Sequence, residues 1–128
     1  MAINFIRLAV VYLIVGVLLG IYMASSHSFD QRDTHAHANL LGWASLAISG
    51  IIYHLFPKLA NHLLAKVHFW LHNLGLPVTL VGIALIYGGN PPIGEPLAGI
   101  GSTVVSLGFL ALLFNVFRPN IADNTHEV

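Results

Sequence analysis

The stretch "FIRLAVVYLIVGVLLGIYMA", residues 5–24, is an apolar run that contains a single charge, Arg7. About 20 apolar residues in a helix cross the hydrocarbon core of a bilayer. Three further apolar stretches of similar length follow, at residues 38–56, 64–87 and 97–117. We therefore expect an all-α fold, a four-helix transmembrane bundle in one domain of residues 1–118, with a polar tail at 119–128. Arg7 before an apolar run also resembles a secretory signal, but the length of the run favours a retained anchor.

The composition points to a membrane protein that is rich in histidine. Of the 128 residues, 56% are hydrophobic and only 8% are charged, against about 25% charged in soluble domains. The zero net charge offers no basic surface to nucleic acid, so we expect membrane lipid and no nucleic acid as a partner. The absence of cysteine excludes disulfides, iron–sulfur clusters and thiolate-ligated metals. The 8 histidines outnumber the 5 lysines and arginines, and imidazole is costly in hydrocarbon but useful as a metal ligand.

The basic residues predict an orientation in the membrane. An even number of spans places both termini on one side, together with the loop at residues 57–65. That side carries four of the five basic residues, Arg7, Lys58, Lys66 and Arg118, and only Arg32 lies opposite. By the positive-inside rule we expect cytoplasmic termini in a bacterial inner membrane.

A histidine pair opens the second apolar stretch, in "DTHAHANLLGW", residues 33–43. Because a helix turns about 100° per residue, His35 and His37 point about 200° apart and are not expected to chelate one ion together. They could serve two different metal centres, or lie exposed at the membrane surface. A haem needs an axial imidazole, a slot of small side chains and apolar walls. Small residues follow His35 along one helix face: Ala38, Gly42, Ser45 and Ser49.

Two residues near the end of the first stretch, Met23 and His27, are candidates for the opposite axial ligand, and the sequence does not rank them. Zinc or copper binding by the histidine pair, with His27 as an added ligand, is an alternative interpretation.

The third stretch contains a second histidine pair, in "KVHFWLHNLGLP", residues 66–77. His68 and His72 lie one turn apart on the same face, and Pro77 frees the carbonyl of Asn73 and predicts a kink. His72 is therefore a further candidate ligand, although hydrogen bonding of His72 and Asn73 across helices explains the pattern equally well. His54, at the end of the second stretch, is expected to approach His68 and form a secondary metal site with it.

A longer stretch, "THAHANLLGWASLAISGIIYHLFPKLANHLLAKVHFWL" at residues 34–71, resembles the tenth and eleventh helices of the catalytic subunit (subunit I) of haem-copper oxidases. That family has a His-x-His pair at the start of the tenth helix, a "YxxFP"-type ending, and an eleventh helix that opens "HFWL". The resemblance implies that His35 is an axial ligand of a high-spin haem and His37 of a low-spin haem, and it gives His68 no ligand role. The family has about twelve helices, and its copper-binding histidines have no counterpart here. We therefore expect a subunit I fragment that is not a complete terminal oxidase, and whether it is an enzyme is left open.

Three functions follow from these observations. The first is a haem b protein, with one or two haems per chain or dimer, that transfers electrons to a redox partner or respiratory complex. A homodimer is expected, and Gly16 and Gly20 form a small-xxx-small pair suited to close helix contact. The second is a nitric oxide- or oxygen-binding haem sensor or small reductase. The third is a non-catalytic accessory or assembly subunit of a respiratory oxidase. A metal or proton transporter that uses His54, His68 and His72 is less favoured, because the spans lack carboxylates.

Overall fold

The computed structural model describes residues 1–119, and within them the chain is helical with no strand. Four helices are long and apolar enough to cross a membrane, which confirms the expected number of spans. The elements are α1 (Ala2–Ser26), α2 (Arg32–His37), η1 (Ala38–Ala44), α3 (Ser45–Leu55), α4 (Pro57–Ala60), α5 (Leu63–Tyr87) and α6 (Pro91–Val116). The expected tail at 119–128, which includes His126, lies outside the described residues from position 120 onward.

Two helix starts differ from the sequence-based expectation. The second helix begins at Arg32, six residues before the apolar stretch at 38–56, so the turn that holds His35 and His37 is helical, as the angle between them assumed. The fourth helix begins at Pro91, six residues before the apolar stretch at 97–117. Proline is well suited to the first turn of a helix, where backbone N–H groups have no partner inside the helix. The turn itself is confined to Gly88–Asn90, with Gly89 at a φ of +93°.

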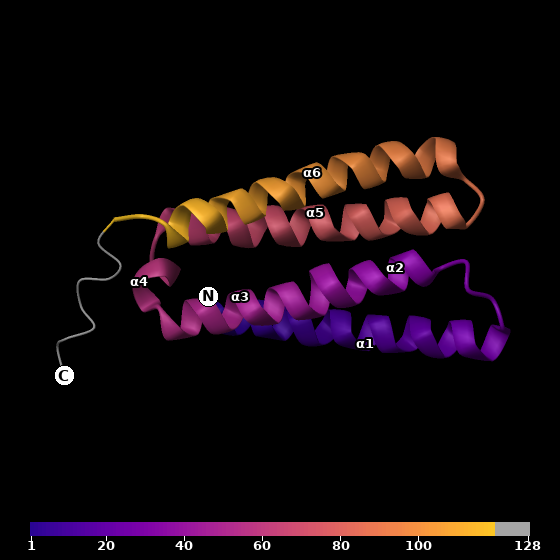
Figure 1. The fold of residues 1–128 in the computed structure, drawn as a ribbon, viewed down its shortest axis with the longest axis horizontal. Helices are drawn as coiled ribbons and strands as arrows, with labels where there is room; N and C mark the ends of the chain where they lie inside the picture. The colour runs from indigo at the N-terminus through magenta and orange to yellow at the C-terminus, as the bar shows by residue number, and fades with distance from the viewer. Residues whose placement is uncertain (120–128) are drawn as a thin grey trace.

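The four spans form two antiparallel hairpins (Figure 1). In one, α1 packs along η1 and α3, and in the other α5 packs along α6. The start of α1, α4 and the end of α6 share one end of the bundle, here called the α4 end. The α1–α2 and α5–α6 connections lie at the opposite end. The buried core draws on both hairpins and comprises Phe5, Ala9, Leu46, Tyr53, Leu59, Ala65, Leu76 and Val105.

Glycine makes the contact between α5 and α6 unusually close. On α6, Gly94, Gly101 and Gly108 recur every seven residues and are all buried, which is the spacing of a helix-packing seam. A Cβ atom at Gly94 would lie 2.6 Å from the carbonyl oxygen of Gly82 on α5. Small residues of this kind let helix backbones approach in a membrane, where apolar burial alone does not drive association.

The small-xxx-small pair of α1 is used inside the chain. A Cβ atom at Gly16 would lie 2.5 Å from Asn39 Nδ2, and one at Gly20 would lie 3.1 Å from His35 Cε1. Both glycines therefore make room for side chains of the second span. They do not form a free face for a second copy of the chain, and the homodimer stays a prediction.

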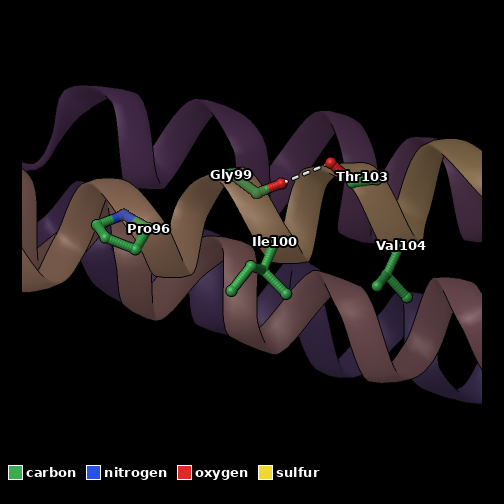
Figure 2. A pocket seen from close by; sticks show the side chains of 5 residues that line it. All are labelled: Pro96, Gly99, Ile100, Thr103 and Val104. Atoms are coloured by element: carbon green, nitrogen blue, oxygen red, sulfur yellow. Dashed lines mark hydrogen bonds between the residues drawn. The ribbon is translucent and has the colours of Figure 1, made fainter.

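The outward face of α6 carries a shallow apolar groove of about 430 Å³ (Figure 2). It is lined by Pro96, Gly99, Ile100, Thr103 and Val104. The Thr103 hydroxyl donates to the Gly99 carbonyl at 2.8 Å, so this polar group is satisfied within the helix. The groove borders none of the candidate ligand residues, and its chemistry is that of a lipid-facing surface.

Candidate functional site

His35 lies between the second span and α1. Its Nδ1 is 2.8 Å from the carbonyl oxygen of Gly16, and because a carbonyl only accepts, Nδ1 carries the proton and donates. Nε2 then holds the lone pair of the neutral ring. The ring rests against Gly20, where the missing side chain provides the space. One turn later, Asn39 Nδ2 donates to the backbone oxygen of His35 at 2.9 Å, and the Asn39 side chain also packs against Gly16.

His37 has the same hydrogen-bonding arrangement with a different partner. Its Nδ1 is 2.8 Å from the carbonyl oxygen of Asp33, one turn earlier on the same helix. Nδ1 again donates, and Nε2 again holds the lone pair. Both rings are half-buried, and neither Nε2 is hydrogen-bonded to any residue between positions 1 and 119. Each histidine therefore presents one oriented nitrogen, Nε2, whose lone pair is unused.

This arrangement is compatible with metal ligation. A metal-ligating histidine usually donates its other ring N–H to a carbonyl or carboxylate, which fixes the tautomer and the direction of the ring. Within the described residues, no three His, Asp or Glu side chains gather around one point. A bare zinc or copper ion needs three or four protein ligands, whereas haem brings four nitrogens of its own and needs only axial ones. The single, separately oriented imidazoles therefore fit haem better than a bare ion.

The candidates for the opposite axial position differ in burial. Met23 is 6% exposed and lies one turn beyond Gly20 on α1. His27 is exposed and ends α1 in the left-handed conformation, at a φ of 53°. Of the two, Met23 lies on the inward side of α1, where His35 also packs.

The structure does not bring His54 and His68 together. His54 is exposed on α3, whereas His68 is fully buried on α5. The neighbour of His68 on α3 is the preceding residue, Tyr53, whose hydroxyl lies 3.0 Å from His68 Nδ1. Sequence reasoning missed Tyr53, although it continues the inward face of Gly42, Leu46 and Ser49 at helical spacing.

His68 and His72 belong to one buried hydrogen-bonded chain. His68 Nε2 lies 3.4 Å from His72 Nδ1, and His72 Nε2 lies 2.9 Å from the carbonyl oxygen of Leu41. The exposed fractions of Tyr53, His68 and His72 are 1%, 0% and 0%. All four ring nitrogens are engaged, so His72 offers no free lone pair to a metal in this arrangement. The expected hydrogen bond across helices is present for His72.

Asn73 does not form a hydrogen bond across helices, and the kink at Pro77 stays a prediction. The α5 helix continues through Pro77 from Leu63 to Tyr87. Asn73 Nδ2 donates to the Phe69 carbonyl on its own helix at 2.7 Å, not across helices. Its Oδ1 is buried without a partner, the one such side-chain atom in the described residues.

The Leu41 carbonyl, which accepts the hydrogen bond from His72, belongs to an irregular segment. Residues Ala38–Ala44 form a π-helix directly after His37. Segments of this kind often occur at functional sites, because they alter the backbone hydrogen bonding of an otherwise regular helix. Here the segment connects the His37 turn with the contact between Leu41 and α5.

Comparison with known proteins gives one partial match. The chain is 38% identical over 58 residues to the "Cbb3-type cytochrome c oxidase subunit CcoN1" of Stutzerimonas stutzeri, which covers 41% of this chain and 12% of that protein. No protein-family profile matches the chain, and no solved structure does. The match supports a relationship to the catalytic subunit of haem-copper oxidases over part of the chain. Together with the four spans, it indicates an oxidase-related membrane protein.

Proposed function

We propose that this chain is a haem b-binding integral membrane protein for electron transfer, with His35 and His37 as axial ligands of separate haems. The observation that carries the proposal is the shared tethering of the two rings. Each Nδ1 donates to a backbone carbonyl at 2.8 Å, which leaves Nε2 free to bind iron. Haem, when bound, supplies a one-electron carrier.

The chain's own residues would orient the group and shield it from water. Gly16 fixes the His35 ring through its carbonyl, and Gly20 leaves the space that the ring occupies. Met23 is the favoured second ligand beside His35 because it is buried on α1, the helix against which His35 packs, and His27 is the second choice. A homodimer and a respiratory redox partner, in a bacterial inner membrane with cytoplasmic termini, complete the proposal.

The test is the visible spectrum of the protein purified in mild detergent after haem-replete expression. We expect a Soret band, with sharp α and β bands after reduction by dithionite. His35→Ala and His37→Ala should each lower the haem-to-protein ratio, whereas His54→Ala, at an exposed position on the same span, should not. A colourless protein, or an unchanged ratio in both histidine variants, would refute haem binding by these residues.

Two alternatives rest on their own observations. His27, the second choice as a further ligand, is exposed at the end of α1, and an iron position left open in this way would suit a nitric oxide- or oxygen-binding sensor or small reductase. A large spectral shift with carbon monoxide would select that function, and no shift would select electron transfer. The partial match to an oxidase subunit also suits a non-catalytic accessory or assembly subunit. That function predicts a colourless protein that co-purifies with an oxidase.

A further inference from the structure

Tyr53, His68 and His72 form a hydrogen-bonded series in which the donor and acceptor of each bond can be assigned. The Leu41 carbonyl only accepts, so His72 Nε2 donates to it and His72 Nδ1 must accept. His68 Nε2 therefore donates to His72 Nδ1, and His68 Nδ1 accepts from the Tyr53 hydroxyl. Both imidazoles are neutral in this state, and every ring nitrogen is satisfied.

The same contacts also accommodate one additional proton. The phenol passes its proton to His68 Nδ1 and takes one from outside, while His68 passes its Nε2 proton to His72 Nδ1. Tyr53 remains a phenol, His68 remains neutral, and His72 carries a single positive charge. The two hydrogen bonds of His68 persist with reversed direction, and His72 still donates to Leu41. The hydroxyl proton of Tyr53 then turns away from His68, and the phenol oxygen accepts from His68 Nδ1, with the Asn115 carboxamide beside it.

A charge inside a membrane protein is costly, and the surroundings of this pair reduce the cost. The ring of Phe5 on α1 lies 5.1 Å from that of His68, and the ring of Phe109 on α6 lies 5.0 Å from that of His72. A cation that lies over the face of an aromatic ring, within about 6 Å of the ring centroid, is stabilised by that ring. The charge can also be shared between the two imidazoles, since the distance between their facing nitrogens is 3.4 Å.

No carboxylate in the described part of the chain is hydrogen-bonded or stacked on this pair. From α3 it meets the Tyr53 phenol, and from α6 it meets Phe109, with Asn115 beyond the phenol. The nearest charged group along this network is Arg118, whose Nε donates to Asn115 Oδ1 at 3.2 Å. Lys58 on α4, Arg7 near the start of α1 and Lys66 near the start of α5 are the other lysines and arginines toward this end of the bundle.

The hydrogen-bonded series of Tyr53, His68 and His72 begins near one end of the bundle. Tyr53 lies two residues before the end of α3 at the α4 end. Leu41 lies twelve residues earlier, which places it roughly 18 Å deeper along the helix axis, about half of a bilayer core. We propose that Tyr53, His68 and His72 form an intramembrane proton relay, which takes up one proton at the α4 end and holds it on the two imidazoles. The proposal does not require haem.

The test is ring ¹⁵N NMR of histidine-labelled protein in lipid bilayers, with the resonances assigned through His68→Gln and His72→Gln. At pH 8 we expect both rings in the Nε2–H form. Between pH 8 and pH 4 we expect uptake of one proton by the pair, with the two rings changing together. A pair that stays neutral at pH 4, in protein with unchanged helix content, would overturn the proposal. So would two rings that titrate independently.

The role of Tyr53 needs a kinetic measurement. Tyr53→Phe keeps the ring packing and removes the hydroxyl, so exchange of the imidazole N–H for deuterium should slow at least tenfold. Tyr12→Phe is the matched control, because Tyr12 packs against Gly42 and has no hydrogen bond to either histidine. Equal exchange rates in the two variants, with unchanged helix content, would show that the proton does not enter through Tyr53.

Discussion

Replacing Gly101 by alanine should weaken the contact between α5 and α6, whereas the same change at Gly99 should not. A Cβ atom on Gly101 would lie 2.6 Å from Thr79 Oγ1 and 2.8 Å from the carbonyl oxygen of Gly75. Non-bonded heavy atoms pack at about 3.5 Å or more, so the helix backbones must separate by roughly 0.7 Å. Overpacking of this kind costs about 1–3 kcal/mol. At Gly99 an added Cβ meets nothing within 4 Å, and alanine gains up to about 1 kcal/mol of helix propensity.

The assay is unfolding of the purified protein by sodium dodecyl sulfate in mixed micelles, followed by far-ultraviolet circular dichroism. Because the two substitutions are chemically identical and two residues apart, differences in hydrophobicity and unfolded-state entropy largely cancel. We expect Gly101→Ala to have a free energy of unfolding at least about 1 kcal/mol below that of Gly99→Ala. Equal values for the two variants would refute the claim that glycine sets the α5–α6 distance.

Three further predictions concern single contacts. Gly20→Ile should displace the His35 ring, because a Cβ atom at position 20 would lie 3.1 Å from His35 Cε1. We expect this variant to bind less haem at unchanged helix content, and Tyr22→Ile, on the exposed face of α1, is the control. Asn73→Leu removes the buried Oδ1 that has no partner. The free energy of unfolding should change by less than about 1 kcal/mol, because removal of this unpaired atom offsets the loss of the Asn73 hydrogen bond to Phe69. A loss of stability above about 2 kcal/mol would show that Oδ1 accepts a hydrogen bond from a bound group. Asn115→Leu breaks the 3.1 Å bond to the Leu59 carbonyl and should cost about 1–3 kcal/mol in the same unfolding assay.

The spans were predictable because the bilayer imposes one length on every helix that crosses it. The starts of two helices were not, because capping is local chemistry that hydropathy does not record. Pro91 illustrates this: a proline that predicts a loop by composition is equally at home in the first turn of a helix. The π-helix at Ala38–Ala44 was also missed. The hydrogen bond from His72 to the Leu41 carbonyl within it comes from another helix, 31 residues away in sequence.

Some features of the candidate site could also be predicted from the sequence, and others could not. Helical geometry alone predicted opposite directions for His35 and His37, and their hydrogen bonds to different backbone segments agree with it. The partner of His35, the Gly16 carbonyl, depends on the register between two helices, which a single sequence does not specify. The choice of Tyr53 over His54 as the partner of His68 depends on which of two neighbouring residues faces inward. Packing of the helices determines which residue faces inward. The expectation of a pair formed by His54 and His68 considered only the chemistry of the two side chains and not this packing.

The second span connects the two polar regions of the bundle through its π-helical segment. His37 ends the regular helix on one side of the segment, and Leu41 lies within it as the acceptor for His72. A π-helical turn advances each residue by less than an α-helical turn, so its presence changes which residues beyond it face α1 and α5. If the segment became regular helix, Leu41 and the ligand candidates could not both keep their present neighbours. The proposed proton relay and the proposed haem ligands therefore both depend on the register of this one segment, although the two sites share no residue.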